Sequence, residues 1–308
     1  MIVVESVLLF VCVFSLVKQS RKHKRSEESQ KLRKEKKKEK RQKKFYFTVR
    51  QQTINTKAEH KHYLTIQPPP NPLYKWKLIS KNHILFNETY DEEQYTENML
   101  DIVFLKKFFE GEYLALVDQL DKWGVETAQY FISEAKKKKN NSRGEYSCVC
   151  FGMHEQVGHH TVHVTPASLH EQGNSGIALF NPLWDKIAVM LQFLFPVLSA
   201  KLLLLPTCDR IFGLLNYGMF HLTPIQKCHI DWNDLEICVV FVLHDDFEGG
   251  HLLFRYLNLE FNLKKGDVII FRSAKLFHEL TKVIGNRRSM VLTVQRSVYN
   301  ILLKTYYE

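Results

Sequence analysis

Two histidines and an aspartate in the C-terminal third of the chain are the residues best suited to do chemistry: His229, Asp231 and His278. His229 and Asp231 are two positions apart in an extended stretch, so both side chains point to one face and can reach one metal ion. Two imidazoles and one carboxylate suit Fe(II), because they fill one face of the ion and leave the opposite positions open for oxygen and a bidentate ligand. A His-x-Asp pair alone is a weak signal, and the residues that follow strengthen it. The pattern favours an oxygenase.

A turn and a strand follow the second histidine, at residues 285–294. One face of this strand begins with small and polar residues and carries Arg287, Ser289, Val291 and Thr293. The other face is apolar beyond its first residue and carries Arg288, Met290, Leu292 and Val294. A guanidinium beside a hydroxyl can hold a carboxylate, so the first face is suited to an acidic co-substrate and the second to packing.

Short strands separated by turns surround these residues. The expected strands include residues 235–243, 257–263 and 266–271, and in the second of them apolar and polar residues alternate with a period of two. Such a series predicts a β-sandwich or a jelly roll.

Residues 228–297 resemble the iron- and 2-oxoglutarate-dependent dioxygenases, and within them the fungal branch of the family of ten-eleven-translocation (TET) and J-binding-protein oxygenases. The likeness is carried by HIDWND at 229–234, DFEGGHLLF at 246–254, GDVIIFRS at 266–273, FH at 277–278 and GNRRS at 285–289. One departure is His251, where many relatives have a small or acidic residue. We interpret it as a solvated strand residue in preference to a ligand or a substrate contact.

The resemblance implies an α+β protein built on a double-stranded β-helix (jelly roll), with Fe(II) bound by the two histidines and the aspartate. It implies that 2-oxoglutarate chelates the iron and that O2 is the oxidant. Arg287, with help from Ser289, is expected to hold the distal carboxylate of 2-oxoglutarate, and Arg288 is the competing choice. Tyr217 is expected to line the co-substrate pocket.

Three hypotheses for the function remain open from the sequence. The first is a dioxygenase that oxidises a C–H bond in the methyl group of a modified pyrimidine in nucleic acid, as the resemblance suggests. The second is a hydroxylase of a protein side chain or small molecule on the same iron site. The third is an inactive jelly-roll binding module, which the retained triad and arginine disfavour.

The oxygenase domain is expected to span residues 45–308, with a helical part at about 95–140 and a jelly-roll core at about 146–300. Apolar spacing predicts helices near residues 98–112, 113–123 and 126–138, with Gly124 separating two of them. The long apolar segment at 184–205 contains charged residues, so we expect a buried helix kinked at Pro196 and not a membrane span.

The N-terminal segments differ from the rest in composition. Residues 18–44 hold 15 Lys or Arg and 4 Asp or Glu, so this stretch contributes +11 to the net charge of +10. Such a tail is typical of a disordered spacer, a nuclear import signal or a patch that binds nucleic acid. Residues 1–17 form an apolar leader too short and too interrupted for a standard membrane span, so we favour an intracellular, nuclear protein over a membrane-anchored one.

Six cysteines are too few for a disulfide scaffold in 308 residues, which favours reduced thiols and an intracellular setting. Cys148 and Cys150 precede several histidines and could form a zinc site. The spacing matches no zinc pattern, and simple alternation on a strand is the interpretation we prefer.

Overall fold

The computed structural model describes residues 77–79, 81–86, 97–135, 147–156, 160–222 and 226–307. They belong to one compact unit, Lys75–Glu308. The predictions for residues 1–17 and 18–44, and for a domain start at residue 45, lie outside the described residues.

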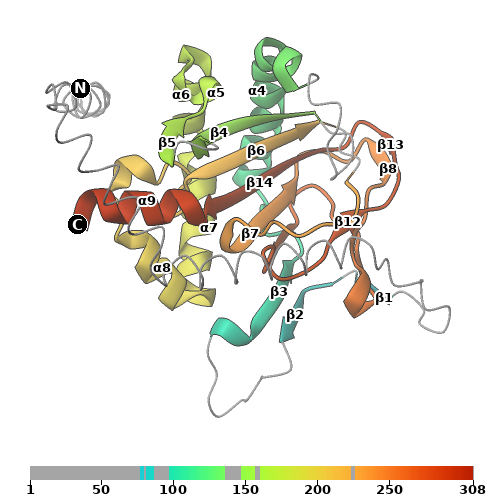
Figure 1. Ribbon diagram of the computed structural model, residues 1–308. Coiled ribbons are helices and arrows are strands. Elements are labelled where there is room, and N and C mark those ends of the chain that lie inside the picture. Colours follow the sequence, from blue (N-terminus) through green and yellow to red (C-terminus); the bar gives the residue numbers. More distant parts are fainter. Residues whose placement is uncertain are drawn as a thin grey trace, which may run out of the picture. The chain divides into compact units, whose positions relative to one another are not determined.

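An eight-stranded antiparallel sheet forms the centre of this unit (Figure 1). Its strand order is β2-β3-β11-β7-β14-β6-β4-β5. In that order the strands are His83–Phe86, Leu100–Leu105, Val268–Phe271, Asp234–Val242, Arg288–Gln295, Tyr217–Leu222, Ser147–Gln156 and Thr161–Val164. The central strands β7 and β11 are rich in β-branched residues and buried almost throughout, which is typical of strands covered on both faces.

A smaller sheet has the order β1-β10-β9-β12 and consists of Lys77–Ile79, Leu259–Phe261, Leu252–Phe254 and Glu279–Leu280. Strands β8 (Phe247–Gly249) and β13 (Val283–Gly285) form a separate pair. Apolar side chains from the small sheet and from β3, β7 and β11 share one core, in which the rings of Phe104, Phe254 and Phe271 take part in edge-on contacts. Two sheets therefore enclose one apolar layer.

Helices cover the other side of the large sheet (Figure 1). They are α4 (Glu112–Ala135), α5 (Pro166–Leu169), α6 (Glu171–Leu179), α7 (Asn181–Leu194), α8 (Pro196–Leu203) and α9 (Arg296–Tyr307), and the 3-10 turns η1 (Glu97–Met99), η2 (Thr207–Asp209) and η3 (Arg255–Leu257) join other elements. Helix α4 contacts β4, and α9 contacts β4, β5 and β14. The fold is thus a mixed α and β arrangement with large antiparallel sheets.

The helices expected near 98–112, 113–123 and 126–138 are wrong in part. Residues 100–105 form strand β3, because β2 and β11 on its two sides supply the hydrogen bonds of a sheet. The next two predicted helices are one continuous helix, α4. Gly124 lies inside this helix, and the Phe220 ring occupies the space that a side chain at position 124 would need. An added Cβ would lie 2.1 Å from Cε2 of that ring. The glycine allows close packing and does not end a helix.

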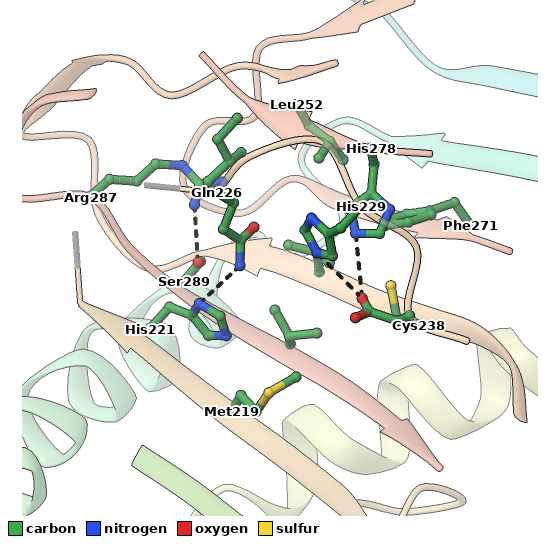
Figure 2. A pocket seen from close by; sticks show the side chains of 14 residues that line it. Met219, His221, Gln226, His229, Cys238, Leu252, Phe271, His278, Arg287 and Ser289 are labelled. Carbon is green, nitrogen blue, oxygen red and sulfur yellow. Dashed lines mark hydrogen bonds and ion pairs between the residues drawn. The ribbon is translucent and has the colours of Figure 1, made fainter. Parts of the chain in front are cut away.

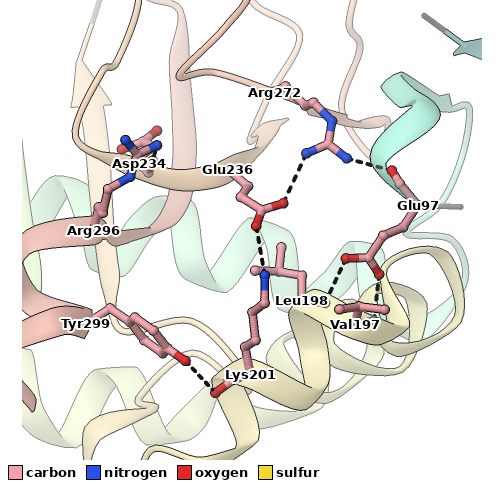
Figure 3. A network of polar contacts seen from close by, with 9 residues as sticks. All are labelled: Glu97, Val197, Leu198, Lys201, Asp234, Glu236, Arg272, Arg296 and Tyr299. Carbon is pink, nitrogen blue, oxygen red and sulfur yellow. Dashed lines mark hydrogen bonds and ion pairs between the residues drawn. The ribbon is translucent and has the colours of Figure 1, made fainter. Parts of the chain in front are cut away.

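The kink expected at Pro196 is present as a break between two helices, since α7 ends at Leu194 and α8 begins at Pro196. The expectation of a buried helix is wrong for one side, because Val189, Phe193 and Val197 are exposed. The Glu97 carboxylate accepts hydrogen bonds from the backbone N–H groups of Val197 (2.6 Å) and Leu198 (2.8 Å), which caps α8 (Figure 3). Within the described residues no single helix is long and apolar enough to cross a membrane, and one bent pair, Gly173–Leu179 with Asn181–Leu194, reaches that length and composition only when taken together.

Candidate metal and co-substrate site

The backbones of His229 and His278 form an isolated antiparallel bridge. The His229 N–H donates to the His278 carbonyl at 3.0 Å, and the His278 N–H donates to the His229 carbonyl at 2.9 Å. The two rings consequently lie side by side, with centroids 4.3 Å apart. Residues 49 positions apart in the chain are held together by this pairing, which the sequence alone did not reveal.

Each histidine ring is also oriented by a local hydrogen bond. Nδ1 of His229 lies 2.6 Å from the Lys227 carbonyl oxygen, and Nδ1 of His278 lies 2.9 Å from that of Leu276. A carbonyl only accepts, so each Nδ1 carries the proton and donates it, and Nε2 is the nitrogen that can act as a metal ligand. Metal-binding histidines are commonly oriented in this way.

Asp231 completes the group. Its Oδ2 atom lies 3.8 Å from Nε2 of His229 and 3.4 Å from Nε2 of His278. The Asp231 N–H donates to the Ser273 carbonyl at 2.9 Å, which ties this residue to the loop that follows β11. In the described part of the chain, these three residues are the one group of His, Cys, Asp or Glu whose ligand atoms all lie within 4.8 Å of one another.

A cavity contains the three candidate ligands at one end and Arg287 at the other (Figure 2). Arg287 is 2% exposed. It donates from Nη1 to Oγ of Ser289 at 3.0 Å, and its Nε has no hydrogen-bond partner among the described residues. Burial lowers the pKa of Arg287 to about 10, still far above neutrality, so the side chain is a buried cation. Gly250 makes room for it, because an added Cβ there would lie 2.6 Å from Cδ of Arg287.

Arg288 has a different environment. Its Nε and Nη2 atoms donate to the two carboxylate oxygens of Asp121 on α4, at 2.5 and 2.6 Å. This bidentate ion pair joins β14 to a helix on the far side of the sheet. Strand alternation places Arg287 toward the cavity and Arg288 away from it, as the polarity of the two faces predicted.

The cavity between these ends is lined by apolar and polar side chains in equal number (Figure 2). The lining residues are Met219, His221, Gln226, His229, Asp231, Cys238, Val240, Leu252, Phe271, His278, Leu280, Arg287, Ser289 and Val291. Figure 2 shows Gln226 between Arg287 and the paired histidines. An elongated dianion with one end on a metal and the other on a guanidinium matches this distribution of charge.

Sequence reasoning missed His221 and Gln226. His221 is 3% exposed, and Nε2 of Gln226 lies 3.4 Å from its Nδ1. Burial, followed by the charge of Arg287, lowers the pKa of His221 to about 4, so this ring is neutral at neutral pH. The signal that could have identified it is the alternation of β6, which puts His221 on the same strand face as Met219.

Other candidate residues lie elsewhere. Tyr217 begins β6 but is not among the residues that line the cavity. The His251 ring hydrogen-bonds the Glu260 carboxylate and lies outside the candidate metal group. It is half-buried and directly precedes β9, so the prediction of a solvated strand residue is wrong. Cys148 and Cys150 lie on one face of β4 with their sulfur atoms 3.9 Å apart, and no zinc-type group includes them among the described residues.

No protein-family model matches the chain, and no curated protein matches it significantly. Among solved structures it is similar to NgTET1 in complex with 5mC DNA, with a TM-score of 0.53 and 15% identity over 73% of this chain and 81% of that chain.

Two further similar structures have TM-scores below 0.5. One is an oxidoreductase of the 2OG-Fe(II) oxygenase family from Burkholderia pseudomallei, with a TM-score of 0.37 and 16% identity over 64% of this chain and 84% of that chain. The other is a prolyl-4-hydroxylase from Pseudomonas putida, with a TM-score of 0.39 and 16% identity over 64% of this chain and 92% of that chain. The fold assignment rests on the first structure: the chain has the fold of NgTET1.

Proposed function

We propose that this protein is an Fe(II)- and 2-oxoglutarate-dependent dioxygenase that oxidises a C–H bond. The observation that carries the proposal is the pairing of two features in one cavity. One end has a His-Asp-His group, and the other has a buried guanidinium that no carboxylate of the described residues neutralises. A buried cation is costly unless it is paired, so the cavity is built to receive an anion.

The residues present fit both groups. His229, Asp231 and His278 would hold Fe(II), since their ligand atoms are close together and both Nδ1 atoms already have carbonyl acceptors. Arg287 and Ser289 would hold the distal carboxylate of 2-oxoglutarate. When bound, the iron and 2-oxoglutarate would supply the activation of O2 that an unreactive C–H bond requires.

The protein's own contribution is orientation and exclusion of water. Arg287 and Ser289 fix one end of the co-substrate, while the neutral His221 adds no second charge beside them. Apolar side chains such as Val240, Leu252 and Val291 are part of the cavity lining and would exclude water from a bound co-substrate, which would strengthen its ionic contacts.

We also propose a more specific architecture for the fold. Two sheets that enclose an apolar layer, with the two candidate histidines paired in a separate backbone bridge, fit a double-stranded β-helix (jelly roll). The helical segments before and around it would support the large sheet.

For the substrate we favour the methyl group of a modified pyrimidine in nucleic acid. The support is the shared fold with NgTET1, whose structure contains 5mC DNA, together with the sequence resemblance. A hydroxylase of a protein side chain or small molecule on the same site is the alternative. An inactive binding module is disfavoured, because such a module has no need of a buried, unneutralised arginine opposite a ligand group.

The test is turnover by the purified protein with Fe(II), 2-oxoglutarate and a panel of methylated DNA, methylated RNA and peptides, with succinate as the readout. Succinate that depends on both iron and 2-oxoglutarate is the expected result, and methylated nucleic acid should stimulate it most. Stimulation by peptides alone would transfer the function to the alternative. No succinate under any condition, in a protein that is folded and binds Fe(II), would contradict the enzyme proposal.

A further inference from the structure

Trp232, directly after Asp231, is 62% exposed. A single exposed ring is ordinary on a protein surface, so the interest of this one lies in its place in the chain, next to a candidate metal ligand. Asp231 itself is the most exposed of the three candidate ligands, at 17% of its side chain against 7% for His229 and 5% for His278. The candidate ligand that is most exposed to solvent is therefore the one that directly precedes Trp232 in the chain.

The backbone around Trp232 is firmly held. The Asp234 N–H donates to the Asp231 carbonyl at 2.8 Å, which closes a four-residue turn with Trp232 at its second position. The Arg296 N–H donates to the Asn233 carbonyl at 2.6 Å, and the Asn233 side chain donates to Oγ of Ser297 at 3.1 Å. Together with the Asp231–Ser273 bond, these contacts present the indole from a fixed position.

Exposed cationic side chains lie on segments that are hydrogen-bonded to this turn or close to it in the chain. Arg296 is exposed, its backbone bonds to the neighbour of Trp232, and its guanidinium donates to the Asp234 carbonyl at 3.3 Å (Figure 3). Lys275 is exposed in the loop that accepts the Asp231 N–H through Ser273, and Lys227 is exposed two residues before His229. Of the two carboxylates in the turn, Asp231 is a candidate metal ligand, and Asp234 is 8% exposed and accepts a hydrogen bond from Ser273.

We propose that Trp232 is a substrate-binding residue that stacks against a base of a nucleic acid at the mouth of the cavity, with Arg296 and Lys275 contacting its phosphates. This inference rests on the proposed function and names a contact that selects its substrate class. An exposed, preorganised aromatic ring flanked by cations fits a base and its backbone, because every base has a flat face and every nucleotide carries an anion. A peptide would supply a flat face only occasionally.

The experiment uses the full chain and a fluorescently labelled oligonucleotide that contains 5-methylcytosine, with fluorescence anisotropy as the readout. Trp232→Leu keeps apolar bulk but removes the ring, and it should weaken binding by about fivefold or more, the usual range for loss of one stacked base. Trp232→Phe keeps a ring and should retain most of the affinity. Phe193→Ala, which removes another strongly exposed ring on α7, is the matched control and should change nothing.

A second measurement separates stacking from charge. Arg296→Gln and Lys275→Gln should each reduce the slope of log affinity against log salt by about 0.7–0.9, whereas Trp232→Leu should leave the slope unchanged. Equal affinities for wild type and Trp232→Leu, or equal losses for the Leu and Phe variants, would overturn the stacking role. Binding and oxidation of peptides without measurable oligonucleotide binding would overturn the substrate class while leaving the dioxygenase proposal intact. Absence of iron-dependent succinate would instead contradict the proposed function itself.

Discussion

His229 and His278 are joined by two reciprocal backbone hydrogen bonds of 3.0 and 2.9 Å, so the two chain segments that carry the candidate ligands are held together by the backbone itself. The Nδ1 atom of each ring donates a hydrogen bond to a backbone carbonyl, and the Nε2 atom of each ring lies near the carboxylate of Asp231. The site is therefore preorganised for metal by the fold.

Because the backbone bridge does not depend on the side chains, His229→Ala and Asp231→Ala should lose Fe(II) binding and turnover while the protein stays folded. Metal content after dialysis and far-ultraviolet circular dichroism measure the two effects. His251→Ala is the control, since His251 pairs with Glu260 and should leave metal content unchanged. Normal succinate formation by either alanine variant at the site would remove the iron assignment.

Arg287→Met should raise the apparent KM for 2-oxoglutarate tenfold or more, because a hydrogen bond to a charged group contributes about 1.5–3 kcal/mol. Arg288→Met should change that KM little and should instead lower the melting temperature, since it breaks the ion pair with Asp121. The reverse pattern would assign the carboxylate to Arg288.

Arg287 also makes a prediction about stability. The burial of Arg287 without a counter-charge disfavours the folded state. A carboxylate of 2-oxoglutarate would pair with this charge only in the folded protein, so the co-substrate should raise the melting temperature of wild type even without turnover. Arg287→Met should abolish most of this rise without lowering the melting temperature of the ligand-free protein. An equal rise in both proteins would mean that the co-substrate binds elsewhere.

The pKa of His221 is about 4 in the folded protein against 6.5 for an ordinary histidine, through burial first and the charge of Arg287 second. Between these values the unfolded chain binds the extra proton, so the contribution of His221 to stability is complete above pH 6.5 and is lost as the pH falls toward 4. Urea unfolding across this range should show a shallower pH dependence for His221→Gln than for wild type. Parallel curves would contradict the assigned environment.

Gly124→Ala tests the packing of α4 on the sheet. Helix propensity alone predicts stabilisation by about 1 kcal/mol. Contact with the Phe220 ring predicts destabilisation by about 1–3 kcal/mol, because the added methyl group has no room. We expect a lower free energy of unfolding, with partial recovery in the Gly124→Ala, Phe220→Leu double variant. A stabilised single variant would show that the ring moves aside at no cost.

The sequence by itself determined the chemistry and the local pattern. The ligand types, the two-residue spacing of His229 and Asp231, and the alternation that separates Arg287 from Arg288 are all readable from residue identity, because a strand has a period of two. The kink before Pro196 was readable for the same kind of local reason, since proline cannot donate a backbone hydrogen bond.

Only the tertiary structure decided which distant residues meet. The 100–105 segment has helical apolar spacing, yet β2 and β11 pair with it as a strand. Gly124 lies within one continuous helix, where the absence of a side chain leaves room for the Phe220 ring of β6. The alternation of β6 places His221 on one face with Met219, but the pairing of β6 with β14 decides that this face meets the cavity. Pairing and packing between residues far apart in the chain depend on the whole fold, and for this reason they override local propensity.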